Sequence, residues 1–286
     1  MKNFIIKMLK GMLIGLSMII PGVSGGTVAV LLNIYDEIIF NINNLKKEFK
    51  NSVLYLLPIV VGAVLSFVIA YFPLKYLLEN FQFQTISLFA GLMIGSTPKL
   101  IVDAKKRGFS KINIISIIIP FMIVIGVCFI PNMKNVDLVD MNALNYLLLF
   151  LVGALASCAL IVPGISGSML LLILGYYQPL LNIISDLKVN FMHSALVIIV
   201  FCIGLVIGFF TIARIMKILF EKYTVGTYWA IVGFVLASII GIFLAVNYNF
   251  SFDLFIIISS VLIIIIGIIL GYFLNKILGD KKEWVI

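Results

Sequence analysis

Long apolar segments alternate with short, lysine-rich polar segments along this chain. Predominantly apolar segments occur at about 52–74, 85–101, 112–131, 194–216, 225–246 and 254–274. A helix needs about 20 apolar residues to cross a bilayer whose hydrocarbon core is about 30 Å thick. The pattern therefore predicts an all-α polytopic membrane protein with three transmembrane helices in each half of the chain.

Two other apolar stretches are interrupted by Pro-Gly and small polar residues. The first, Met18–Ile39, reads MIIPGVSGGTVAVLLNIYDEII, and the second, Leu160–Leu181, reads LIVPGISGSMLLLILGYYQPLL. The arms of the first are short for a bilayer, since Phe4–Ile20 contains two lysines and Thr27–Phe40 is shorter still. Irregular backbone inside a membrane is tolerated only where protein buries it or it lines a wet cavity. We therefore expect each interrupted stretch to be a re-entrant helical hairpin.

The two interrupted stretches are separated by a fixed offset, from Pro21 to Pro163, which we call the repeat spacing. Further residues match at the same offset, including Tyr35 with Tyr177, Gly62 with Gly204, Lys75 with Lys217, Glu79 with Glu221, and Gly91 with Gly233. Charged residues and glycines in one register indicate an internal duplication. We expect one membrane domain over 1–286, with repeat 1 at about 1–135 and repeat 2 at about 140–277. The N-terminal segment then has a mid-chain twin, which argues against a cleaved signal peptide.

The basic residues predict the orientation. The chain has 20 Lys and Arg against 12 Asp and Glu, with 63% hydrophobic residues and a mean hydropathy of +1.24. If each hairpin returns to the side it entered, all basic residues share one side except Lys75, Lys134 and Lys188. The positive-inside rule makes the first side, with both termini, cytoplasmic. Two full crossings per hairpin give the same result, whereas one kinked span does not.

Three crossings per half is an odd number, so the second half is expected upside down relative to the first. Such inverted-topology repeats are characteristic of secondary transporters, whose broken helices meet near the midplane. Free N–H groups at the start of a half-helix, together with its dipole, favour an anion such as phosphate. The candidate substrate-binding residues in the two loops are Ser24, Gly25, Gly26, Thr27, Ser166, Gly167 and Ser168. The alternative is that small residues in the loops only allow close helix packing.

Several charged residues outside the loops are further candidates. Lys75 with Glu79, and Lys217 with Glu221, are spaced i, i+4 and form either ordinary surface pairs or gates that meet a lipid phosphate on entry and exit. Arg214 lies about one turn deeper than Lys217 and either snorkels to the interface or holds phosphate with its planar fork.

Some polar and aromatic residues have no counterpart of the same kind in the other half. Asp36 and Glu37 end the first interrupted stretch, and a solvated pair at a helix end is expected, with proton coupling of transport as the alternative. Glu79 and Glu221 are further candidates for coupling. Tyr228 and Trp229 are expected to be anchors in the interfacial aromatic belt.

The duplicated PGVSGGT and PGISGS stretches resemble those of the PopT family of bacterial polyprenyl-phosphate translocases, and the resemblance covers essentially the whole chain. It implies return of undecaprenyl phosphate from the outer to the inner leaflet of the bacterial cytoplasmic membrane. The expected partner is therefore a polyprenyl phosphate lipid, with no cofactor, metal or nucleic acid. Cys128, Cys158 and Cys202 stand singly in apolar runs, which indicates neither a disulfide framework nor a zinc site.

Two other function classes stay open. Undecaprenyl-pyrophosphate phosphatases carry a PG-x-S-R-S-G motif, which PGISGS partly resembles, but Gly167 stands where the arginine would be. Phosphoryl chemistry needs concentrated positive charge, often with a metal, and neither loop contains a basic residue or a carboxylate. A small-anion transporter would use the same loops with a water-filled path closed to lipid. A lipid translocase instead needs a lateral groove for the tail.

Overall fold

The computed structural model describes residues 2–19, 23–139, 141–186, 189–244 and 254–278, and within them the chain is helical with no β-strand. The first half contains α1 (Lys2–Ile19), α2 (Gly25–Leu31), α3 (Tyr35–Asn44), α4 (Phe49–Asn80), α5 (Gln82–Lys106) and α6 (Ile112–Cys128). The second half contains α7 (Ala143–Ile161), α8 (Gly167–Ile173), α9 (Tyr177–Ser185), α10 (Phe191–Lys222), α11 (Thr224–Leu244) and α12 (Leu254–Leu278).

The apolar helices identify a multi-pass membrane protein. The six expected apolar segments form α4, α5, α6, α10, α11 and α12. Within the described residues, six helices are long and apolar enough to cross a membrane, namely α4, α5, α7, α10, α11 and α12. Helix α6 is apolar but shorter, whereas α7, the first arm of the second interrupted stretch, has 19 residues and reaches crossing length. The sequence pattern did not single out α7 as a full-length helix.

Helix boundaries recur at the repeat spacing seen in the sequence. Gly25 and Gly167 begin α2 and α8 at matching positions, and both helices have 7 residues. Helices α4 and α10 begin at Phe49 and Phe191, also matching positions, and each has 32 residues. At about 1.5 Å per residue each of these long helices extends about 48 Å, more than the hydrocarbon core requires.

The turns that follow α2 and α8 also have the same backbone structure. Asn33 and Gly175 adopt the left-handed conformation, with φ of 60° and 74°. The N–H of Ile34 bonds to the carbonyl of Ala29, and the corresponding bond joins Tyr176 to Leu171. This 6→1 bond, with its 5→2 companion, ends each helix in a Schellman motif. In the first half the turn leads into α3 with a bend of 115° between α2 and α3.

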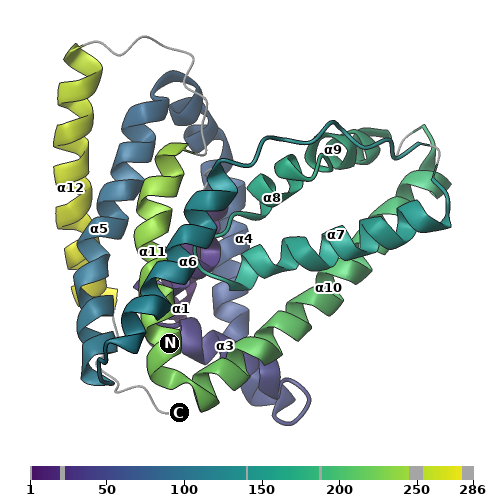
Figure 1. The fold of residues 1–286 in the computed structure, drawn as a ribbon. Coiled ribbons are helices and arrows are strands. Elements are labelled where there is room, and N and C mark those ends of the chain that lie inside the picture. Colours follow the sequence, from purple (N-terminus) through teal and green to yellow (C-terminus); the bar gives the residue numbers. More distant parts are fainter. Residues whose placement is uncertain (1, 20–22, 140, 187–188, 245–253, 279–286) are drawn as a thin grey trace.

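Helix pairing joins the two halves. Helix α1 packs on α4 and α7 on α10, but the last helix of each half packs on the other half, α6 on α11 and α12 on α5 (Figure 1). These exchanged pairs are very close: a Cβ on Gly91 of α5 would lie 2.4 Å from the carbonyl oxygen of Ile264, and one on Gly233 of α11 would lie 2.2 Å from that of Ile117. Small residues allow membrane helices to approach this closely.

The two interrupted stretches differ in how they pack. In Figure 1, α5, α11 and α12 stand side by side, while α7 to α10 project as an arm. Helix α2 lies between the halves with six of its seven residues buried, whereas in α8 only Ile173 is buried. The largest core cluster accordingly contains residues of α2, α3 and α11. Helices α2 and α3 of the first stretch are therefore docked in the centre, and α8 of the second stretch is more open.

Candidate functional site

The two interrupted stretches contact each other directly at the centre of the molecule. The buried hydroxyl of Thr27 accepts a hydrogen bond of 2.7 Å from the backbone N–H of Gly164. The hydroxyl of Ser24, also buried, donates to the carbonyl oxygen of Ala159 at 3.1 Å. Pro21 and Gly22 lie outside the described residues. Ser24 and Thr27, in the described part of the first stretch, thus lie against residues 159 and 164 at the second stretch.

Two further residues, Tyr35 of α3 and Gly26 of α2, lie close to the end of α7. The hydroxyl of Tyr35, at the start of α3, donates to the carbonyl oxygen of Ile161 at 2.8 Å, where α7 ends. A Cβ on Gly26 would lie only 2.7 Å from the same oxygen. The end of α7 thus has its free carbonyls capped by side chains of the other half, which satisfies groups that a helix C-terminus leaves without intrahelical donors.

The second loop makes fewer such contacts. Ser166 and Ser168 lie with their hydroxyl oxygens 3.0 Å apart, and Ser168 is only half-buried. A Cβ on Gly167 would meet no atom closer than 3.6 Å, so there is room at the start of α8. Gly164 has a φ of +89°, which requires glycine at the break itself.

The loops contain backbone donors without intrahelical acceptors, and they enclose little space. The first N–H groups of α2 and α8 have no acceptor within their own helix, and the side chains of the N-cap residues Ser24 and Ser166 do not cap them. A cavity of about 10 Å³ beside Gly164 and Ser166 has room for about one water. A group as large as a phosphate does not fit in this cavity. The described residues contain no group of three or more His, Cys, Asp or Glu placed to hold a metal ion.

Asp36 is buried, so the expectation of a solvated pair at a helix end is wrong for it. It is 6% exposed and accepts a hydrogen bond from the hydroxyl of Tyr228 in α11. The guanidinium of Arg107 lies 4.1 Å from the centre of the Tyr228 ring. The belt position expected for Tyr228 and Trp229 is also wrong, because both are buried, and the indole of Trp229 donates to the carbonyl of Gly108 at 3.0 Å. The sharp bend before α3 explains the burial of Asp36, since it turns the start of α3 inward.

A second polar cluster joins α1, α3 and α4. Glu37 is half-buried rather than solvated, and it accepts a hydrogen bond from the hydroxyl of Tyr55. The ammonium of Lys7 lies 3.6 Å from the centre of the Tyr55 ring. Lys10, one turn further along α1, is fully buried. The sequence predicts both lysines only as charges at the membrane surface, although Val152 stands at the position of α7 that matches Lys10 and so marks this lysine as unusual.

The expected lysine–glutamate pairs form. Lys75 lies 3.7 Å from Glu79 on α4, and Lys217 lies 3.7 Å from Glu221 on α10. The first pair is well exposed, whereas Lys217 is half-buried. Arg214 is exposed on α10, so the structure does not bring it to the buried loops.

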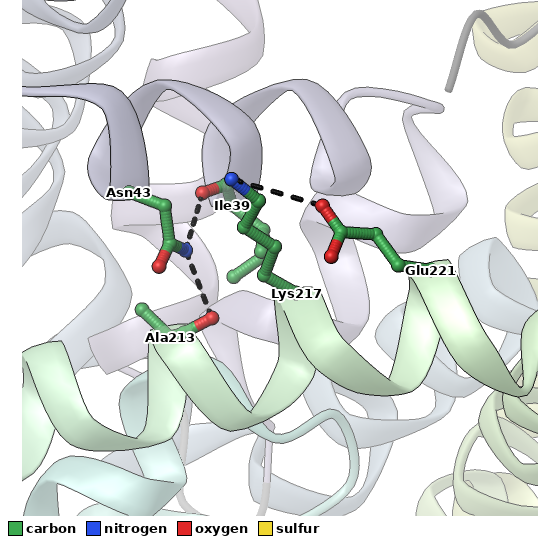
Figure 2. Close-up of polar contacts among 5 residues, drawn as sticks. All are labelled: Ile39, Asn43, Ala213, Lys217 and Glu221. Carbon is green, nitrogen blue, oxygen red and sulfur yellow. Dashed lines mark hydrogen bonds and ion pairs between the residues drawn. The ribbon is translucent and has the colours of Figure 1, made fainter. Parts of the chain in front are cut away.

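Lys217 is less exposed than Lys75, and Figure 2 shows it lying beside the residues of α3. Helix α3 crosses α10 here, and the side-chain amide of Asn43 donates to the carbonyl oxygens of both Ile39 and Ala213 at 2.9 Å. Lys217 reaches along α3 towards Glu221. The second lysine pair therefore lies where the docked first hairpin meets the second half.

Two apolar grooves open towards the surface, at positions related by the repeat spacing. One, of about 770 Å³, lies between α6, α10 and α11, and Pro163 of the second loop lines it. The other, of about 540 Å³, lies between α4, α5 and α12. Leu219 and Thr227 line the first where Leu77 and Thr85 line the second.

Comparison with known proteins identifies the family. A family model described as undecaprenyl phosphate translocase-like matches residues 14–253. A polyprenyl-phosphate transporter of Staphylococcus aureus is 30% identical over 282 residues, which cover 97% of this chain and 98% of the relative. A polyprenyl-phosphate transporter of Vibrio cholerae is 25% identical over 251 residues, covering 83% of this chain and 77% of the relative. No solved structure matches. The chain belongs to the undecaprenyl phosphate translocase-like family.

Proposed function

We propose that this protein moves undecaprenyl phosphate across the bacterial cytoplasmic membrane and returns the lipid from the outer to the inner leaflet without chemical change. The observation that carries the proposal is the contact between the two related loops, Thr27 with Gly164, inside a chain that belongs to this family. The names of both relatives support transport of a polyprenyl phosphate rather than catalysis. The lateral apolar grooves favour a lipid as the transported molecule, because a lipid tail needs such a groove. A transporter of small anions instead needs a path that is closed to lipid.

The phosphate head group binds at the two loops. The backbone N–H groups that begin α2 and α8 are the main donors, and the hydroxyls of Ser24, Thr27, Ser166 and Ser168 add hydrogen bonds. Lys75 and Lys217 meet the phosphate at the two membrane surfaces, each beside its partner Glu79 or Glu221. Arg214 contributes only if the arm of α7 to α10 moves, since it is exposed here.

The two halves form an inverted repeat with re-entrant hairpins, and both termini are cytoplasmic. Recurrence of the helix boundaries at the repeat spacing supports the repeat, and the distribution of lysines supports the orientation. In this orientation the loops near Lys47 and Arg107 are cytoplasmic, while the segments near Gln82 and Asp137 are outside. The regions near Lys188 and Tyr248, also expected outside, and the C-terminal lysines Lys281 and Lys282 lie beyond the described residues.

Transport works by alternate docking of the hairpins. The first hairpin is docked through Ser24, Thr27 and Tyr35, while the second is open. Applying the repeat spacing to these contacts gives the opposite state, in which Ser166 and Tyr177 donate to the carbonyls of residues 17 and 19. The buried contact between Asp36 and Tyr228 has to break when the first hairpin leaves. Asp36, with Glu37 beside it, is therefore the coupling candidate.

Purified protein in liposomes tests this function. Labelled undecaprenyl phosphate should change leaflet in the presence of the protein, with no inorganic phosphate released from it or from undecaprenyl pyrophosphate. Phosphate release from the pyrophosphate lipid at enzyme-like rates would instead favour the phosphatase alternative. Uptake of inorganic phosphate without lipid movement would favour a small-anion transporter.

Single-cysteine variants test the orientation. A membrane-impermeant thiol reagent applied to intact cells should modify a cysteine at position 82 and leave one at position 47 unmodified, because residue 47 follows the short α3 on the lysine-rich side. Labelling of 47 but not of 82 would reverse the assignment. Cells opened with detergent provide the control in which both positions react.

A further inference from the structure

The two grooves correspond residue by residue. On the long helices Leu74 of the smaller groove matches Met216 of the larger one, and Phe81 matches Tyr223, at the repeat spacing. The third wall of each groove comes from an exchanged helix. Ile264 of α12 contacts Gly91, and Ile117 of α6 contacts the matching Gly233, so Ile264 and Ile117 occupy equivalent positions. Ser259 lines the smaller groove and Ile112 the larger one, and they precede Ile264 and Ile117 by the same number of residues. Both grooves are thus built by the repeat and not by accidental packing.

Small side chains account for the difference in size. The larger groove has Gly226 and Ala230 where the smaller groove has Gln84 and Leu88. The groove with the smaller side chains has the larger volume, about 770 Å³ against about 540 Å³.

We infer that the two grooves hold the polyprenyl tail of the transported lipid, one groove in each leaflet. This rests on the proposed function and orientation: the larger groove, with Lys222 and the start of α6 at its edge, then faces the cytoplasmic leaflet, and the smaller groove faces the outer leaflet. The larger groove reaches Pro163, so a tail lying in it leads directly to the second loop. A phosphate held at the loops and a tail lying in the groove can thus belong to one molecule.

The grooves increase the rate of lipid movement and contribute little to the affinity of the protein for the lipid. A tail in the bilayer is already in hydrocarbon, so moving it into an apolar groove removes little further apolar surface from water. The groove instead allows the tail to remain among apolar groups while the phosphate moves through the protein. Filling a groove should therefore slow movement of a long-tailed lipid and leave binding of a short-tailed phosphate intact.

Three tryptophan variants test the inference. Ala230→Trp fills the cytoplasmic groove, and Leu88→Trp, at the matching position, fills the outer one. Gly126→Trp is the control, because Gly126 lies on α6, lines neither groove, and has no atom within 4 Å of an added Cβ. Each variant is compared with the unchanged protein in liposomes for movement of undecaprenyl phosphate, and in detergent for binding of decyl phosphate.

Both groove variants should slow undecaprenyl phosphate movement by about tenfold or more, which is an added barrier of about 1.4 kcal/mol, with decyl phosphate binding unchanged. The control should transport at the rate of the unchanged protein. Normal rates in both groove variants, equal slowing in the control, or loss of decyl phosphate binding in both groove variants would overturn the inference. Failure of the unchanged protein to move undecaprenyl phosphate would reject the proposed function instead.

Discussion

Replacing Thr27 by valine removes one hydrogen bond at the contact between the two loops and keeps the shape of the side chain. Thr27 is fully buried, and its hydroxyl accepts the N–H of Gly164, which is buried too. A buried donor left without an acceptor costs about 1–3 kcal/mol. Undocking of the first hairpin should therefore become easier by that amount, which changes the equilibrium by about 5- to 150-fold.

Hydrogen exchange in detergent measures this change. Backbone amides of α2 and α3 should exchange faster in Thr27→Val by up to the same factor, because exchange of a locally opening segment follows the free energy of opening. Amides of α12, which packs on α5 and not on this hairpin, should exchange at their original rate. The control variant is Thr97→Val. Thr97 is also buried, but its hydroxyl donates to the carbonyl oxygen of Met93 in its own helix, at 2.7 Å. Its replacement therefore leaves no donor of another segment without an acceptor. Equal exchange of α2 and α3 in the two variants would refute the view that this hydrogen bond holds the hairpin in place.

Two further substitutions test packing in the same region. Gly26→Ala should lower the thermal stability in detergent much more than Gly167→Ala. The new Cβ would lie 2.7 Å from a backbone oxygen at position 26, but no closer than 3.6 Å to any atom at position 167. Equal losses of stability would show that the two loops are equally packed. Tyr228→Phe removes the hydroxyl that bonds to the buried Asp36 and should destabilise the protein by about 1.5–3 kcal/mol if that carboxylate is charged, as measured by denaturant unfolding, whereas an unchanged stability would show that Asp36 finds another donor.

The sequence contained enough information to locate the helices and the breaks. Apolar runs of crossing length and the Pro-Gly-x-Ser pattern depend on local composition, so the starts of α2 and α8 at Gly25 and Gly167 follow the motif directly. The repeat spacing then relates helices that are far apart in the chain. It does not say how each copy is packed. Although the turns at Asn33 and Gly175 are alike, one hairpin is docked and the other is open.

The polar cluster around Asp36 was not predictable for a physical reason. Its partner Tyr228 is 192 residues away, in a helix whose apolar pattern gives no indication of which face is buried. An acidic residue in the first turn of a short helix normally lies at the surface, where it is solvated and favoured by the helix dipole. Only the bend of 115° before α3 brings it into the interior. Lys10 was missed similarly, because a lysine near the start of a membrane helix is normally read as an interfacial charge.

The exchange of α6 and α12 between the halves constrains how the chain can be assembled during synthesis. Helix α5 ends at Lys106, but its partner α12 begins only at Leu254, after about half of the whole chain has been added. At a translation rate of about 5–20 residues per second, the glycine-lined face of α5 waits about 7–30 s for the helix that covers it. Helix α6 is made before its partner α11, so that pair can close first. A ribosome that stops before Leu254 therefore leaves a nascent chain whose α5 lacks its main neighbour and whose glycine-lined face is not covered by α12.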